Sequence, residues 1–238
     1  MRLVAWNIRS GGGRRLPGIA GALAAHDADV LVLSEFRTRP GAALLEALGT
    51  AGWPHAATTV PGGSRNGVAV VSRQPLEALP PPPLPRAEHV ERWLELELRG
   101  SRFGLTALYV PTMISGLDKP AFWEALLAAS AERLDRPWLI AGDLNTGLHG
   151  IDERGATVGC ADAFQRLLDQ GWIDAWRAIH GDRREYSWRS PRRRYGIRLD
   201  HAFLSPPLAE RLVDCRYSQA EREAGLSDHA ALVLELAG

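Results

Sequence analysis

An apolar run at residues 138–141, with the sequence WLIA, constrains the fold more than any other segment of this chain. A short, continuous apolar run predicts a strand buried in the core of a sheet. The run ends at Gly142, and Asp143 and Asn145 follow closely. The sequence thus carries a carboxylate and an amide to the end of a core strand, where a simple turn is one explanation and a functional site is another.

Strand-like and helix-like segments alternate in the first third of the chain. Apolar runs predict buried strands at 2–8, 29–36 and 66–73. Segments with helical periodicity predict helices at 16–28 and 40–52. This alternation is typical of sheets whose strands are joined by helices.

A hairpin and several further elements follow. Residues 93–98 alternate apolar and polar side chains, as a half-buried strand does, and 101–112 form the returning strand. The proline-rich segment 79–86 predicts a stiff surface connection, because proline lacks the N–H that a central strand needs. The remaining predicted helices lie at 117–134 and 160–171, and strand-like pieces lie at 185–190, 197–206, 211–218 and 229–236.

Alternation and a hairpin in one chain predict an α/β fold with two mixed β-sheets packed face to face and helices outside, a four-layer sandwich. A chain of 238 residues can bury a large core and lies within the range of one domain, so a single domain over residues 1–238 is expected. No period of 20–50 residues repeats, which excludes solenoids and propellers.

The composition indicates the class of protein but does not identify its binding partner. The formal net charge is zero, and all 28 basic residues except Lys119 are arginine. This fits a compositional bias, although arginine also binds phosphate with two parallel hydrogen bonds. Two cysteines are too few for a disulfide framework. With no secretory signal and no apolar stretch near the ~20 residues of a membrane span, we expect a soluble cytoplasmic protein, a monomer without membrane contact.

Several predicted strands end in polar or ionisable side chains. Taken singly, each has a common structural explanation, such as a turn, a solvated carboxylate, a core aromatic ring or an ion pair between Arg198 and Asp200. Their recurrence at strand ends favours one functional site instead. The residues are Asn7, Glu35, Tyr109, Asp143, Asn145, Asp200, Asp228 and His229.

Part of this set suits a hard metal ion. Glu35, Asn7 and Asp228 offer carboxylate and amide oxygens, which suit Mg²⁺ or, as a substitute, Mn²⁺. A phosphodiester substrate needs its non-bridging oxygens neutralised, an in-line nucleophile and a stabilised leaving group. We expect the metal to meet the first of these needs.

The rest of the set suits activation of a water molecule. Asp143 is expected to position or deprotonate the attacking water, and Asn145 to fix its orientation. His229 is expected to contact a phosphate oxygen, with Asp200 holding the imidazole in one tautomer. The sequence contains no Gly-x-Ser-x-Gly elbow, no Gly-x-Gly-x-x-Gly pattern and no Walker-type lysine, so these competing chemistries are not supported.

The segments WNI, SEF, YVP, GDLN, YSWRS, YGIRLDHAFLS and LSDHAALVLEL occur in the order typical of the endonuclease/exonuclease/phosphatase superfamily, which has the DNase-I-like fold. The second half resembles most the exonuclease III and AP endonuclease branch. The likeness runs from Asn7 to His229, and GDLN with a downstream SDH is its most specific part.

The resemblance implies a four-layer sandwich and metal-dependent hydrolysis of a phosphoester. It assigns metal binding to Glu35 and Asn7, metal binding or support to Asp228, and contact with the scissile phosphate to Tyr109. The other four residues receive the roles that their chemistry already suggested.

Residues 182–198 give the best indication of the substrate. The segment interleaves arginine with aromatic side chains, a pattern that fits a loop following a polyanionic backbone and stacking on bases. A solvated charged loop is the alternative. The expected substrate-binding residues are Arg189, Arg192, Arg193, Arg194, Trp188 and Tyr195.

The sequence therefore predicts a Mg²⁺-dependent phosphodiesterase acting on DNA, as an abasic-site endonuclease, a 3′-5′ exonuclease or a 3′-phosphatase, with no order among the three. Hydrolysis of a small-molecule or lipid phosphoester by the same metal centre is the alternative. A nucleic-acid-binding protein without activity is disfavoured, because no expected catalytic group is missing.

Overall fold

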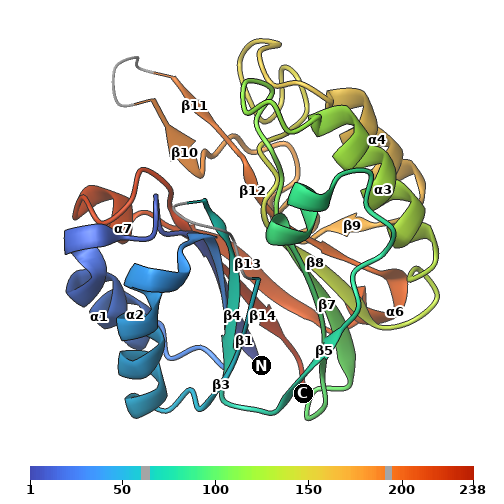
Figure 1. Ribbon diagram of the computed structural model, residues 1–238. Coiled ribbons are helices and arrows are strands. Elements are labelled where there is room, and N and C mark those ends of the chain that lie inside the picture. Colours follow the sequence, from blue (N-terminus) through green and yellow to red (C-terminus); the bar gives the residue numbers. More distant parts are fainter. Residues whose placement is uncertain (60–64, 191–194) are drawn as a thin grey trace.

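Two six-stranded mixed β-sheets pack face to face at the centre of the computed structural model, which describes residues 1–59, 65–190 and 195–238 (Figure 1). Their strands run along the molecule from the end that carries both termini to the end that carries the small hairpin of β10 (Trp188–Arg189) and β11 (Gly196–Ile197). This hairpin forms a separate two-stranded sheet.

The first sheet combines both ends of the chain in the order β13-β14-β1-β2-β4-β3. Strand β1 is parallel to β2 and antiparallel to β14. The strands of this sheet are β1 (Arg2–Asn7), β2 (Val30–Phe36), β3 (His55–Thr58), β4 (Gly67–Ser72), β13 (Leu212–Ser218) and β14 (Ala231–Leu236).

The second sheet has the order β5-β6-β7-β8-β12-β9. Strands β6 and β7 form the expected antiparallel hairpin, β7 is parallel to β8, and β12 is antiparallel to β8. The strands of this sheet are β5 (Leu76–Leu79), β6 (Trp93–Leu98), β7 (Phe103–Tyr109), β8 (Trp138–Asp143), β9 (Ile173–Asp174) and β12 (Asp200–Leu204).

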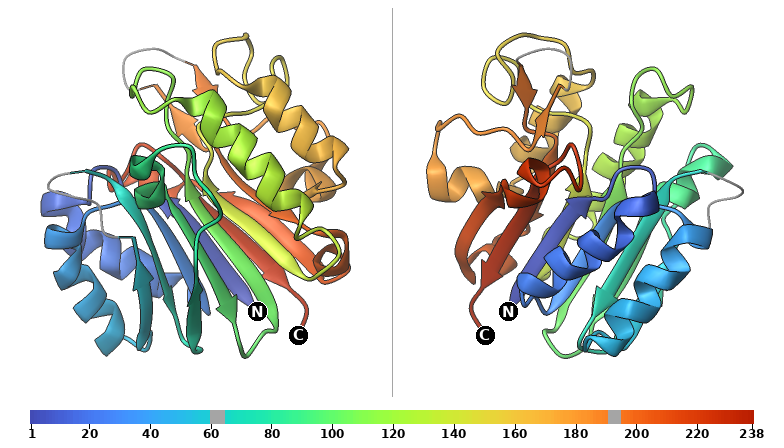
Figure 2. Two further views of the ribbon diagram at one scale, coloured as in Figure 1. Left: turned by 45° about the vertical axis from the view of Figure 1, so that its right-hand side comes forward. Right: turned by 90° about the vertical axis from the view of Figure 1, so that its left-hand side faces the viewer.

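Helices cover the outer face of each sheet (Figure 2). Helices α1 (Leu16–Ala25) and α2 (Thr38–Thr50) pack on the first sheet, and α3 (Lys119–Ala131) and α4 (Ala161–Asp169) pack on the second. The predicted four-layer sandwich is confirmed. Shorter elements are η1 (Gly13–Arg15), η2 (Ala87–Arg92), α5 (Ala175–His180), α6 (Pro206–Ala209) and α7 (Ala220–Glu223).

Strand β8 explains why the WLIA run is apolar throughout. Leu139 and Ala141 lie in the core between the two sheets, whereas Trp138 and Ile140 lie in the core under α3 and α4. Because successive side chains of a strand point to opposite faces, a strand in the middle of four layers buries both sets.

The sequence misjudged some shorter elements. The first helix was expected over 16–28 but ends at Ala25, and the strand expected over 185–190 is reduced to Trp188–Arg189. Helix α5 was not predicted, because six residues show too little periodicity. Its start is fixed by Asp174, whose side chain accepts a hydrogen bond from the backbone N–H of Arg177 at 3.0 Å.

Within the described residues, no helix combines the length and the apolar character that crossing a membrane requires. The cytoplasmic location and the monomeric state stay predictions.

The topology brings the polar strand ends together. Parallel neighbours β1 and β2, and likewise β7 and β8, finish at the same edge of their sheet, and β12 begins there because it is antiparallel to β8. Strand β1 also contacts β8 across the gap between the sheets. The polar residues at these strand ends therefore face one another at one end of the sandwich.

A buried ion cluster holds the segment that leads into β12. The Arg198 guanidinium is fully buried, and it donates from Nε to Asp152 at 2.7 Å and from Nη1 to Asp174 at 3.0 Å. The alternative of an ion pair between Arg198 and Asp200 was wrong, because Arg198 turns away to these two carboxylates. Burial alone would raise the pKa of Asp174, but the charge of Arg198 outweighs it and holds that pKa well below its usual range.

Replacing Arg198 with methionine (Arg198→Met) should lower the free energy of unfolding by about 3–5 kcal/mol at pH 7, because the buried Asp174 loses its arginine counter-charge and Asp152 keeps only Arg177. Denaturation with urea measures this loss. The matching change Arg216→Met, at an exposed ion pair on β13, should cost under about 1 kcal/mol.

Lowering the pH should reduce the difference in free energy of unfolding between the wild type and Arg198→Met. The low pKa of Asp174 stabilises the wild type above about pH 4, the range of a free aspartate, and this contribution fades as the pH falls further. The cluster would not stabilise the fold as proposed if Arg198→Met and Arg216→Met unfolded at the same urea concentration. A stability loss of Arg198→Met that became larger at low pH would also contradict it.

Candidate active site

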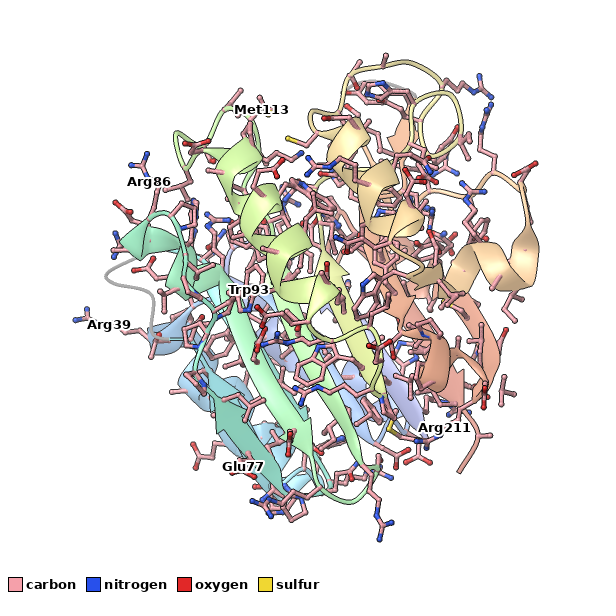
Figure 3. All side chains as sticks on the ribbon, turned by 90° about the vertical axis from the view of Figure 1, so that its right-hand side faces the viewer. Arg39, Glu77, Arg86, Trp93, Met113 and Arg211 are labelled. Carbon is pink, nitrogen blue, oxygen red and sulfur yellow. The ribbon has the colours of Figure 1, made fainter. Side chains whose placement is uncertain are left out.

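A pocket of about 440 Å³ opens at the end of the sandwich where the polar strand ends meet. Its walls combine residues from both sheets with the loop after β7 and the β10–β11 hairpin. Figure 3 shows Met113, which lies on its rim, at the opposite end of the molecule from Arg211. The lining residues expected from the sequence are Glu35, Tyr109, Asp143, Asn145, Trp188, Tyr195, Asp228 and His229.

Three site residues stand side by side on neighbouring strands of the second sheet. Tyr109 on β7 is paired with Asp143 on β8, which is paired with Asp200 on β12. Paired residues share one face of a sheet. Leu139 and Ala141, four and two residues before Asp143, lie in the core between the sheets, so Asp143 points into the same layer at its open end.

Gly142 allows this close packing of strands. Its φ is +137°, and a Cβ atom there would lie 2.1 Å from the carbonyl oxygen of Leu108 on β7. Only glycine fits, since any side chain would push β7 and β8 apart. The glycine of the GDLN motif thus has a steric reason.

Asn7 joins the two sheets at the site. It follows Leu3 and Ala5 of the central core on the same face of β1, and its Nδ2 donates to Asp143 at 2.8 Å and to Glu35 at 3.1 Å. Its Oδ1 accepts from the backbone N–H of Arg9 at 2.8 Å. In this orientation the amide nitrogen bridges the carboxylates of Asp143 and Glu35. The expected metal ligation by the amide oxygen stays a prediction.

Glu35 reaches the pocket through an irregularity of β2. Alternation along the strand would place Ser34 in the central layer and Glu35 on the opposite face, but the register shifts between Ser34 and Phe36, and Glu35 has a φ of +57°. Such a bulge re-aims a side chain at the expense of local strain.

Three elements fix the Glu35 carboxylate after the bulge has turned it. It accepts from the backbone N–H of Ser10 at 2.6 Å, from Asn66 Nδ2 at 3.0 Å and from the Tyr109 hydroxyl at 3.2 Å. Burial and the nearby Glu35 carboxylate raise the pKa of Tyr109 well above its usual range, so its hydroxyl stays a donor at neutral pH.

Asp143 and Asn145 form a tight turn that is also part of the site. Asp143 Oδ1 accepts from the backbone N–H of Asn145 at 2.9 Å, and Asn145 Nδ2 donates to the carbonyl of Val110 at 2.9 Å. Burial, followed by the charge of Asp200, raises the pKa of Asp143 to about 7. The carboxyl group is therefore poised to accept a proton near neutral pH.

His229 and Asp200 form a buried ion pair, 2.8 Å from imidazole Nδ1 to carboxylate Oδ2. Burial lowers the pKa of His229, but the Asp200 carboxylate outweighs burial and raises it to about 10. The ring is therefore an imidazolium at neutral pH, with Nδ1 donating to Asp200.

Asp228 lies at the rim, about a quarter exposed. Its Oδ2 accepts from Trp188 Nε1 at 3.2 Å, and its Oδ1 lies 3.8 Å from Arg9 Nε. Trp188 also forms an isolated β-bridge with His229, which attaches the β10–β11 hairpin to the site.

The site can hold a metal ion. Ligand atoms of Asp143, Asp200 and His229 lie within 4.8 Å of one another, and Asp200 Oδ1 is buried without a hydrogen-bond partner in the described residues. Glu35 and Asp228 face the same pocket. The site thus has four carboxylates and one imidazolium, so negative charge is in excess. Carboxylate oxygens are hard ligands, and this donor set suits a divalent cation.

The structure describes only part of residues 182–198, the segment that interleaves arginine with aromatic side chains. Trp188 and Tyr195 line the pocket, with ring centroids 5.9 Å apart, and Arg189 lies over the Tyr186 ring on an exposed surface. Arg192, Arg193 and Arg194 lie outside the described residues.

The sequence interpretation missed several residues that support the site. Ser187 Oγ accepts from the backbone N–H groups of Leu199 and Asp200, at 2.9 and 3.0 Å. Ser227 Oγ donates to the carbonyl of Asn7 at 2.6 Å. Both serines stand inside quoted motifs, YSW and LSDH, which is the signal that pointed to them.

Lys119 also lines the pocket, through its side chain from the start of α3. It was noted only as the single lysine of the chain.

The model of the Endonuclease/Exonuclease/phosphatase family matches residues 4–229. The chain belongs to this family. Comparison with curated proteins gives no match. Among solved structures, an AP endonuclease from Archaeoglobus fulgidus has 23% identity and a TM-score of 0.85, with 99% of each chain covered.

Two further structures are similar over 100% of both chains. The 3′ phosphatase NExo from Neisseria, bound to a product DNA hairpin, has 26% identity and a TM-score of 0.83. The 3′-5′ exonuclease NExo from Neisseria meningitidis has 28% identity and a TM-score of 0.81. The expected superfamily and its DNase-I-like fold are thereby confirmed.

Replacing Asp200 with asparagine (Asp200→Asn) should lower the pKa of His229 well below about 10, because burial is then opposed only by the weaker charges of Asp143 and Asp228. NMR titration of the imidazole in metal-free protein measures this shift. The control Asp214→Asn, at an exposed aspartate of β13, should leave His229 charged through pH 8. A wild-type His229 that titrates near pH 6.5 would contradict the ion pair.

Proposed function

We propose that this protein is a metal-dependent phosphodiesterase that acts on DNA, by abasic-site incision, 3′-5′ trimming or removal of a 3′-phosphate. The observation that carries the proposal is the pocket in which Asp143, with a pKa near neutrality, faces the His229–Asp200 ion pair. The two NExo structures, described as a 3′ phosphatase and a 3′-5′ exonuclease, support DNA as the substrate class.

Mg²⁺ is the proposed cofactor, with Mn²⁺ as a substitute. Glu35 and Asp228 would hold it, together with Asn7 if the amide presents its oxygen. When bound, the ion would neutralise charge on non-bridging phosphate oxygens and stabilise the leaving oxygen. The buried oxygen of Asp200 and the three other carboxylates of the site, Asp143, Glu35 and Asp228, support a divalent cation at this place.

Asp143 is the proposed base. Its pKa of about 7 allows it to take a proton from the attacking water, and the bonds from Asn7 and the Asn145 backbone fix the direction of its oxygens. Asn145 is proposed to orient the same water. Precise aim matters, because a small misplacement of the nucleophile costs much of the rate.

His229 and Tyr109 are the proposed donors to the phosphate. The imidazolium of His229 keeps its Nδ1 on Asp200, so Nε2 is the nitrogen left for a phosphate oxygen. The Tyr109 hydroxyl stays protonated, and both Tyr109 and its hydrogen-bond partner Glu35 line the pocket.

Trp188, Tyr195 and Arg189 are the proposed DNA contacts beside the site. Two aromatic rings on the hairpin offer surfaces for stacking, and the exposed guanidinium offers an electrostatic contact with the backbone. The same role for Arg192, Arg193 and Arg194 is proposed from the sequence alone.

The decisive experiment incubates the protein with a labelled duplex that contains one abasic-site analogue, with Mg²⁺ and again with EDTA. Incision at the lesion would identify an abasic-site endonuclease. Trimmed ends without incision would identify an exonuclease, and release of phosphate from a 3′-phosphorylated strand would identify a 3′-phosphatase. No cleavage of any DNA, beside hydrolysis of a generic phosphodiester, would refute the DNA assignment.

Replacing Asp143 with asparagine (Asp143→Asn) should lower the cleavage rate at least ~10²-fold, because the amide cannot accept the proton. DNA affinity, measured by fluorescence anisotropy, should change little. The control Asp135→Asn removes an exposed carboxylate remote from the pocket and should keep full activity. Equal rates for Asp143→Asn and the wild type would rule out this base.

A further inference from the structure

Lys119 is the single lysine of a chain whose other 27 basic side chains are arginine, since Lys and Arg together number 28. Arginine thus serves at every other position that requires a permanent positive charge. A lysine that persists against this bias marks a place where a compact ammonium and a planar guanidinium are not equivalent.

This one lysine is buried at the pocket. It is the first residue of α3, and only 2% of it is exposed. The preceding Asp118 has a left-handed φ of +47°, and its side chain caps the helix by accepting from the backbone N–H of Ala121 at 3.2 Å. This entry to α3 directs the Lys119 side chain toward the second sheet.

The Lys119 ammonium holds the turn that carries the proposed base. Its Nζ donates to the backbone carbonyl of Asn145 at 2.5 Å, which is its only hydrogen bond to the described part of the chain. Asn145 has a left-handed φ of +48°, and its backbone N–H is the donor to Asp143 Oδ1. The lysine therefore fixes, through one peptide unit, a strained residue that in turn orients Asp143.

The remaining geometry explains why arginine does not serve here. The Lys119 side chain is almost fully buried and its ammonium bonds to a single carbonyl, and a charge-assisted bond of this kind needs a point donor. Burial lowers the pKa of Lys119 to about 8, partly offset by the nearby Asp143 and Cys160, so the group remains largely charged at pH 7. Burying a charge to this extent costs free energy unless a hydrogen bond or a counter-charge compensates for the lost water.

We propose that Lys119 is a positioning residue of this site, which locks Asn145 in its left-handed conformation and thereby aims Asp143. The kinetic consequence rests on the proposed phosphodiesterase activity, whereas the structural consequence does not. Two variants separate the roles of charge and shape. Lys119→Met keeps about the same side-chain length but removes the ammonium, and Lys119→Arg keeps the positive charge in a larger, planar group.

The first measurement is hydrogen exchange of the backbone amides at 144–146 in metal-free protein. Lys119→Met should speed exchange in this turn at least tenfold, with the strands of both sheets unchanged. Arg166→Met, which removes an exposed cation of α4 paired with Glu124 on α3, is the matched control and should leave the turn unchanged. Equal exchange in Lys119→Met and the wild type would overturn the proposal.

The second measurement separates kcat from KM on the DNA substrate that the wild type cleaves. Both lysine variants should lose about 10²-fold in kcat with KM within about threefold, as a misaimed base requires. Full activity of Lys119→Arg, or a loss confined to KM, would overturn the positioning role in favour of a plain charge contact. A wild type that cleaves no DNA would refute the proposed function, while the exchange measurement would still decide the role of Lys119.

Discussion

The bond between Asn7 and Asp143 is the contact on which the site depends, because it joins the two sheets at their open end. Alternation along β1 and β8 directs both side chains into the layer between the sheets, where the residues before them form the apolar core. The same alternation that buries the core therefore delivers the polar groups once the core ends. Glu35 needs a bulge in β2 and a left-handed backbone to join them.

Charge balance then explains the distinct properties of the groups. Asp143, Asp200, Glu35 and Asp228 are crowded around one pocket, so their mutual repulsion and burial must be relieved. The imidazolium of His229 offsets one charge, and the repulsion that remains contributes to the raised pKa of Asp143. A divalent cation would relieve the rest, which is why the proposed cofactor and the proposed base belong to the same electrostatic arrangement.

Support from outside the pocket is as specific as the pocket itself. Arg198 anchors the start of β12 with two buried carboxylates, and Lys119 holds the turn after β8 by a single bond to a carbonyl. Gly142 permits β7 and β8 to approach each other. These three residues touch none of the proposed reacting atoms, yet each fixes a strand end that carries one of them.

The sequence by itself determined the four layers, the buried β8 and the polar strand ends that meet at the pocket, because apolar periodicity and recurrent polar strand ends are local patterns. It did not determine the orientation of the Asn7 amide, the bulge at Glu35, the partners of Arg198 or the position of Lys119. These depend on contacts between segments more than twenty residues apart in the chain, which only packing of the two sheets creates. The pKa values of Asp143 and His229 belong to the same class, since burial and neighbouring charge exist only in the folded protein.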